Sequence, residues 1–102
     1  MKKRKRAVRL LRLAEEDFTD IVTYISAQRP QAAEVLAQRI EKSLKLLSVN
    51  PYLGRVPNDT MLAELGYRYL VVQDYLIFYV CEDQTIYVHR IIHGARDYRE
   101  LL

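Results

Sequence analysis

The chain has 102 residues and a net charge of +3; half of its residues are hydrophobic, and only three are glycine and three are proline. This composition predicts one globular domain over residues 1–102 and excludes the disordered, low-complexity and collagen-like classes. No apolar run approaches the roughly 18 residues that cross a bilayer, and no secretory leader is visible. Cys81 is the single cysteine and is interpreted as a small packing residue, so we expect a cytoplasmic protein.

The positive charge is concentrated in the first six residues, as Lys2, Lys3, Arg4, Lys5 and Arg6. One interpretation is a solvated, flexible tail. The other is an electrostatic arm that speeds encounters with nucleic acid or with an acidic partner. Composition alone leaves both open.

The first elements are predicted to be a short strand and a helix. Residues Ala7–Leu13 alternate imperfectly and favour a strand. From Ala14 the period changes, and one apolar helical stripe follows: Ala14, Phe18, Ile21 and Ile25. Acidic residues 15–17 fall in the first helical turn, where carboxylates interact favourably with the helix dipole.

A second helix is predicted over Pro30–Val49, because proline suits the first helical position and Asn50-Pro51 ends the pattern. Its apolar stripe is Ala33, Leu36, Ala37, Ile40, Leu44 and Leu47. Two amphipathic helices joined by a short break predict an antiparallel helical hairpin.

Three strands are predicted after a loop that contains Gly54 and Pro57: Tyr67–Val72, Tyr75–Cys81 and Thr85–His93. The short connections between them predict an antiparallel meander. The expected fold class is α+β, in two layers of order β-α-α-β-β-β. The helical hairpin covers one face of a mainly antiparallel sheet, and a short C-terminal helix follows.

Strict alternation sorts the strand residues onto two faces. We expect an aliphatic face beneath the helices: Leu70, Val72, Leu76, Phe78, Val80, Ile86, Val88 and Ile92. The other face carries Tyr67, Tyr69, Tyr75, Tyr79, Tyr87, His89 and His93, with Val71, Ile77 and Ile91 between them. This second face is either a half-exposed surface covered by the C-terminal segment or a docking surface for another chain.

No motif in the chain predicts a cofactor or a metal site. Three scattered glycines do not build a phosphate-binding loop. His89 and His93 lie in one strand, where four residues advance about 13 Å, too far for both to ligate one ion by adjacency.

The segment after the last strand is dense in functional side chains. With Arg68 and Arg90, it gathers guanidiniums, an imidazole and a phenol near one sheet edge, a set suited to metal-free RNA cleavage. In the structural alternative, Asp97 pairs with an arginine, and Tyr98, Leu101 and Leu102 tie a short helix to the sheet. Both interpretations are retained.

The ordered set of elements and motifs resembles the RelE/ParE toxin superfamily of type II toxin–antitoxin systems. The resembling segments are Val8-Arg9-Leu10, Ala14–Phe18, Tyr24-Ile25, Asn50–Arg55, Tyr67-Arg68, Tyr75–Tyr79 and Val88–Tyr98. Two departures are visible. Leu11-Arg12 stands where the family often has Ser/Thr-Pro before the first helix, and Leu76 stands where nuclease members resembling RelE commonly have arginine.

The resemblance implies a plasmid-stabilising, growth-arresting toxin that a cognate antitoxin neutralises by laying a segment over the helical hairpin and the sheet. The His-Gly-x-Arg-Asp ending resembles the ParE branch, which implies a non-enzymatic inhibitor of DNA gyrase. The alternative is a ribosome-dependent mRNA endonuclease, with the ribosome and mRNA as partners. A simple basic RNA-binding module is a weaker third hypothesis, because the aromatic pattern matches no RNA-binding signature.

The candidate residues follow from these hypotheses. The target-contact candidates are Arg68, Arg90, His93, Arg96, Tyr98 and Arg99. The nuclease candidates are Arg68, His89, His93, Arg96 and Tyr98. The antitoxin-contact candidates are Tyr69, Tyr75, Tyr79 and Tyr87.

Overall fold

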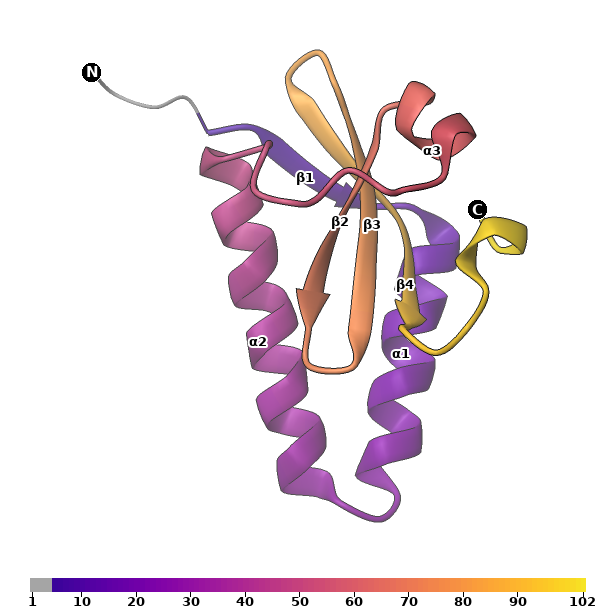
Figure 1. Cartoon of the computed structure of the whole chain (residues 1–102). Coiled ribbons are helices and arrows are strands. Elements are labelled where there is room, and N and C mark those ends of the chain that lie inside the picture. Colours follow the sequence, from indigo (N-terminus) through magenta and orange to yellow (C-terminus); the bar gives the residue numbers. More distant parts are fainter. Residues whose placement is uncertain (1–4) are drawn as a thin grey trace.

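The computed structural model describes residues 5–102 (Figure 1). In chain order the elements are β1 (Ala7–Leu10), α1 (Arg12–Ser26), α2 (Pro30–Val49), α3 (Thr60–Glu64), β2 (Tyr67–Val72), β3 (Tyr75–Glu82), β4 (Thr85–His93) and the short 3₁₀ helix η1 (Tyr98–Glu100). Within residues 5–102, no helix is both long and apolar enough to cross a membrane.

The four strands form one sheet in the order β1-β4-β3-β2. Strands β2, β3 and β4 are an antiparallel meander, and β1 adds to β4 in parallel. The two long helices form an antiparallel hairpin that packs on the sheet (Figure 1). The predicted α+β class and order of elements are therefore confirmed.

The main core lies between the helical hairpin and the sheet. Ala14 of α1 and Leu36, Ile40 and Leu47 of α2 are at most 1% exposed. These residues belong to the two stripes predicted from the helical period, and Pro30 occupies the predicted start of α2. Burial of each of the leucine and isoleucine side chains stabilises the fold by about 1.5–3 kcal/mol.

The predicted division of the sheet into faces is wrong for β3. Val72 and Tyr75 flank the two-residue turn and pair directly, so they share a face. The helix face therefore carries Tyr75, Ile77 and Tyr79. The opposite face carries the other residues of β3, and its buried cluster consists of Leu62, Tyr67, Phe78, Val80 and Ile92, with Tyr69, Leu76, Tyr98, Leu101 and Leu102 packed against it.

A β-bulge in β4 changes the faces a second time. Tyr79 pairs with Val88 and Phe78 pairs with Arg90, which leaves His89 as the extra residue. Val88 and Ile91 consequently both reach the helix-side core, whereas strict alternation had placed them on opposite faces.

Several boundaries differ from the predicted ones. Strand β1 ends at Leu10 and α1 begins at Arg12, after an extended Leu11 whose side chain gives no capping hydrogen bond. Helix α3 was expected to be part of a loop; Asp59 caps it by accepting a hydrogen bond from the Leu62 amide at 3.0 Å.

Only part of the predicted basic tail can be compared with the structure, because residues 1–4 lie outside the described residues. Arg6 belongs to the described part, and its amide donates to the Ser48 carbonyl at 2.8 Å. The Ser48 hydroxyl in turn donates to the Arg6 carbonyl at 2.7 Å. These two bonds fix Arg6 against the end of α2.

The buried Tyr79 hydroxyl fastens the loop after α2 to the sheet. It donates to the Pro51 carbonyl at 2.9 Å and accepts from the Gly54 amide at 2.8 Å. A Cβ atom at Gly54 would lie 2.7 Å from the Tyr79 oxygen, so glycine is required for this close approach. Tyr79 is 1% exposed, which removes it from the surface proposed for an antitoxin.

Tyr79→Phe should lower the free energy of unfolding by about 1–3 kcal/mol, because it leaves a buried amide and a buried carbonyl without their partner. Urea denaturation followed by circular dichroism measures this. Tyr24→Phe is the matched control, because Tyr24 is 82% exposed and its hydroxyl is solvated. Equal stability of the two variants would contradict the structural role of the Tyr79 hydroxyl.

Candidate functional site

Arg90 of β4 is held inside the structure by three hydrogen bonds. Its Nε and Nη2 donate to the Asp17 carboxylate at 2.7 and 2.9 Å, and its Nη1 donates to the Leu101 carbonyl at 3.1 Å. The hydrogen bond to Asp17 is the main cause that raises the pKa of Arg90. The two side chains are only 16% and 15% exposed, so we remove Arg90 from the target-contact candidates and assign it a structural role.

The segment after β4 turns back across the sheet face opposite the helices. The Gly94 amide donates to the Asp74 carbonyl at 2.8 Å, and the Arg96 amide donates to the His93 carbonyl at 3.0 Å. Tyr98 packs on Phe78 with ring centroids 4.9 Å apart. These contacts present the Arg96 side chain at the surface.

Asp97 and Arg99 form an exposed ion pair, Nε to Oδ1, at 3.2 Å. The Asp97 carboxylate also accepts from the Arg99 amide, so Asp97 caps η1. The hydrogen bond from the Arg99 side chain is the largest cause that lowers the pKa of Asp97. Part of the structural alternative for this segment is therefore realised, because Arg99 is engaged within its own turn.

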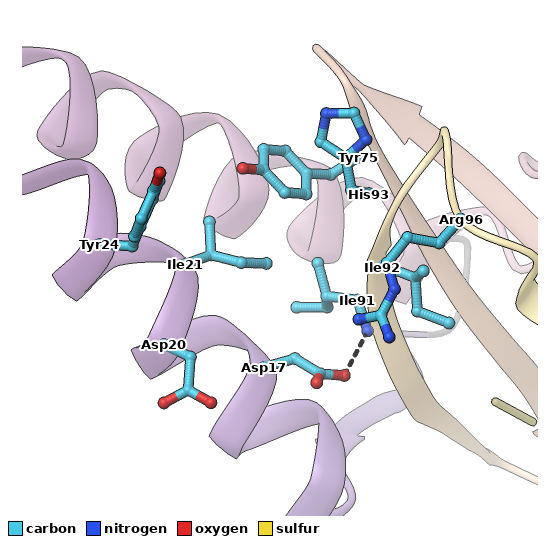
Figure 2. Close-up of a pocket in the computed structure, with 9 residues that line it drawn as sticks. All are labelled: Asp17, Asp20, Ile21, Tyr24, Tyr75, Ile91, Ile92, His93 and Arg96. Atoms are coloured by element: carbon cyan, nitrogen blue, oxygen red, sulfur yellow. Dashed lines mark hydrogen bonds between the residues drawn. The ribbon is translucent and has the colours of Figure 1, made fainter.

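A shallow groove of about 280 Å³ lies between α1 and the part of the sheet where β3 begins and β4 ends (Figure 2). Helix α1 contributes Asp17, Asp20, Ile21 and Tyr24; the sheet contributes Tyr75, Ile91, Ile92 and His93; and Arg96 completes the set. The groove thus combines carboxylates, exposed aromatic surface and a guanidinium.

His93 is placed at the edge of this groove by two contacts. Its ring stands edge-on to Tyr75 with centroids 5.4 Å apart, and its Nδ1 accepts from the Ala95 amide at 3.1 Å. Burial raises the pKa of Tyr75, with smaller contributions from Asp74 and Tyr24. Tyr75 is therefore a neutral phenol at physiological pH, able to donate or accept a hydrogen bond.

His89 lies on the opposite face of the sheet from His93. Its Nδ1 is 3.1 Å from the Tyr67 hydroxyl, and the two rings meet edge to face at 5.0 Å. Burial lowers the pKa of His89 and raises the pKa of Tyr67. Among residues 5–102 no group of three or more His, Cys, Asp or Glu side chains has a geometry that would hold a metal ion.

The five nuclease candidates border several separate hollows. His93 and Arg96 share the groove of Figure 2, and Arg96 borders a second hollow with Tyr98. His89 instead lines an apolar hollow with Leu101 and Leu102. Arg68 lies beside the loop after α2, where its Nη1 donates to the Gly54 carbonyl at 2.9 Å. The structure therefore does not bring the five residues together.

The contribution of α1 to this groove was not predicted from the sequence. Asp17, Asp20 and Tyr24 follow the spacing i, i+3 and i+7, which places them on one helix face beside the apolar stripe. That spacing is a signal in the sequence for a shared face. The predicted placement of residues 15–17 in the first helical turn is wrong, because α1 begins at Arg12 and only Glu15 of the three lies in that turn. The antitoxin-contact candidates also divide: Tyr69 and Tyr87 lie on the sheet face away from the helices, and Tyr75 borders the groove.

Because the pKa of His89 is lowered, the free energy of unfolding depends on pH in a predictable direction. The unfolded chain, with an ordinary histidine pKa near 6.5, binds a proton more readily than the folded protein, so stability falls as pH drops below about 6.5. We expect His89→Gln to flatten the decline in unfolding free energy between pH 7.5 and 5. His93→Gln, at an exposed histidine, is the control; parallel curves for wild type and His89→Gln would contradict the assignment.

Comparison with known proteins gives a family for the chain. The model of the family described as "ParE toxin of type II toxin-antitoxin system, parDE" matches residues 8–98. No curated protein matches the chain.

Two solved structures share the fold. The first is a chain from the "Chromosomal ParDE TA system from P. aeruginosa", with a TM-score of 0.71 and 20% identity over 87% of this chain and 96% of that chain. The second comes from the crystal structure of the toxin–antitoxin complex RelBE2 from Mycobacterium tuberculosis, with a TM-score of 0.63 and 21% identity over 93% of this chain and 98% of that chain. Because the family model covers nearly the whole chain, the protein belongs to the ParE toxin family of type II toxin–antitoxin systems, within the RelE/ParE superfamily.

Proposed function

We propose that this toxin arrests growth by binding DNA gyrase and stabilising its cleaved-DNA state, and that a cognate antitoxin neutralises it in the cytoplasm. The observation that carries the proposal is the separation of the nuclease candidates. Arg68 and His89 border other hollows than His93 and Arg96, so the described residues present a contact surface rather than an assembled catalytic set. Membership of the ParE family supports the same target.

In this proposal the gyrase-contacting surface is centred on Arg96. Its guanidinium points into the groove beside α1 (Figure 2). Tyr98 lies two residues further along the same segment and borders a neighbouring hollow with Arg96. A surface-exposed arginine beside aromatic rings is a common anchor in protein interfaces. Toxicity then depends on shape and charge complementarity, and the toxin needs no chemical step of its own.

The groove also suits an antitoxin segment. Tyr24 offers a largely exposed ring in the same groove as the carboxylates and Arg96, so a peptide laid along α1 would find both apolar and charged contacts. The two solved neighbours come from a ParDE system and from a RelBE2 toxin–antitoxin complex, which supports a partner of this kind. An antitoxin that covers Arg96 would block the gyrase-contacting surface directly. Such a pair would account for plasmid stabilisation.

A ribosome-dependent mRNA endonuclease is the second candidate. The observation in its favour is that Arg96 borders hollows shared with His93 and with Tyr98, which leaves a cation, an imidazole and a phenol on one segment. Leu76 in place of the nuclease arginine weighs against it.

The proposal predicts that the purified toxin makes gyrase accumulate linear plasmid DNA and lose supercoiling activity. Arg96→Ala should weaken this effect about thirtyfold or more, since truncation of an interface anchor costs about 2 kcal/mol or more. Titration of toxin into a plasmid cleavage assay measures both.

Arg39→Ala is the control, because Arg39 is an exposed arginine on the solvent face of α2. It should match the wild type. Indifference of gyrase to the wild-type toxin, together with codon-specific cleavage of mRNA on translating ribosomes, would replace the gyrase proposal with the endonuclease.

A further inference from the structure

A polar hollow lined by Arg6 and Arg68 lies away from the groove of Figure 2 and shares no lining residue with it. It encloses about 380 Å³, and its lining includes Arg6, Tyr52, Gly66, Arg68 and Asp83. These residues come from the residue before β1, the loop after α2, the chain entering β2 and the β3–β4 turn. The hollow therefore joins four segments that are far apart in the sequence.

Arg6 supplies a guanidinium that is partly buried and not fully bonded. Its backbone is fixed to Ser48 of α2 by the two hydrogen bonds described above. Its Nε is buried and finds no hydrogen-bond partner within residues 5–102. A buried donor without a partner raises the free energy of the folded protein. An acceptor that enters the hollow and bonds to this donor would lower that free energy, which favours binding.

Arg68 supplies a second guanidinium in a fixed orientation. Its Nη1 donates to the Gly54 carbonyl at 2.9 Å, and its Cζ lies 5.1 Å from the centre of the Tyr52 ring. Arginine has a planar fork of five donors, and the bond to Gly54 occupies one of them. Both guanidiniums line the same hollow before any ligand binds. Such a preorganised pair of donors suits the several acceptor oxygens of a phosphate group.

The charge and the aromatic surface favour a polyanion as the ligand. Asp83 is the one carboxylate in the lining, against two arginines, so the hollow is net positive. In the sequence, Lys2, Lys3, Arg4 and Lys5 immediately precede Arg6 and add positive charge next to it along the chain. Tyr52 is 69% exposed, which leaves ring surface on which a base would stack.

We propose that this hollow binds the phosphodiester backbone of a single-stranded nucleic acid, with Arg6 and Arg68 on a phosphate and Tyr52 against a base. This site is separate from the surface centred on Arg96, and it is tested without gyrase or antitoxin.

The experiment is fluorescence anisotropy with a fluorescein-labelled oligodeoxythymidylate of twelve nucleotides and the full chain. We expect Arg6→Gln and Arg68→Gln each to raise the Kd about tenfold, the effect of losing one charge-assisted hydrogen bond, and to reduce the salt slope by about one. Tyr52→Leu should also raise the Kd about tenfold through lost stacking. Circular dichroism verifies that each variant is folded, and Arg6→Gln is decisive because the backbone bonds of Arg6 are retained.

Arg29→Gln is the matched control, because it removes one exposed arginine at the α1–α2 turn, at the other end of the hairpin from Arg6. It should change the Kd less than twofold. Equal weakening by Arg29→Gln and Arg6→Gln would overturn the site in favour of general charge attraction. Binding of a fluorescent polyglutamate peptide that depends on Arg6 but is unaffected by Tyr52→Leu and by excess oligonucleotide would assign the hollow to an acidic peptide and likewise overturn the proposal.

Discussion

The structure depends most on the pair formed by Asp17 and Arg90. Strand β1 covers β4 only as far as Val88, so the remaining edge of β4 needs another partner. Asp17 of α1 supplies it, because its carboxylate accepts from the Ile91 amide at 3.0 Å (Figure 2). The same carboxylate also accepts from Arg90. Arg90 also donates a hydrogen bond to the Leu101 carbonyl. One partly buried ion pair thus joins the first helix, the last strand and the C-terminal segment. Removing one partner from such a pair leaves a poorly solvated charge.

The two proposed surfaces lie in different parts of the molecule. On one side of β4, the groove beside α1 holds His93 and Arg96. On the other face of the sheet, the C-terminal segment closes a second core over Phe78. The hollow at Arg6 and Arg68 lies beside the loop that Tyr79 fastens to the sheet. The groove and the hollow share no lining residue, so the two proposed surfaces can be tested separately.

Local patterns predicted the helices well and the faces of the sheet poorly. The apolar stripes of α1 and α2 depend only on the helical period, and the strand limits of β2 and β4 follow from residue type. Which side chains of β3 face the helices depends on the register that the Gln73-Asp74 turn sets between β2 and β3. The face of Ile91 depends on the bulge in β4. Alternation along a single strand predicts neither of them. The role of Arg90 required knowledge that Asp17, distant in sequence, lies beside it. Arg96 and His93 could be predicted because charged and aromatic side chains are concentrated in the C-terminal segment. The residues that α1 adds to the groove could not, because they are distant from that segment in the sequence.

Amide hydrogen exchange of Arg90→Gln, followed by NMR, tests most directly whether this pair holds the C-terminal segment. Loss of the bond to the Leu101 carbonyl should speed exchange of the Leu101 amide, which donates to Tyr98, by about tenfold, while amides in the β2–β3 ladder keep their protection. Asp20→Asn, which changes an exposed carboxylate one turn along α1, should exchange like the wild type. Unchanged protection of Leu101 in Arg90→Gln would contradict the account, because the segment that carries Arg96 would then be held by its apolar contacts alone.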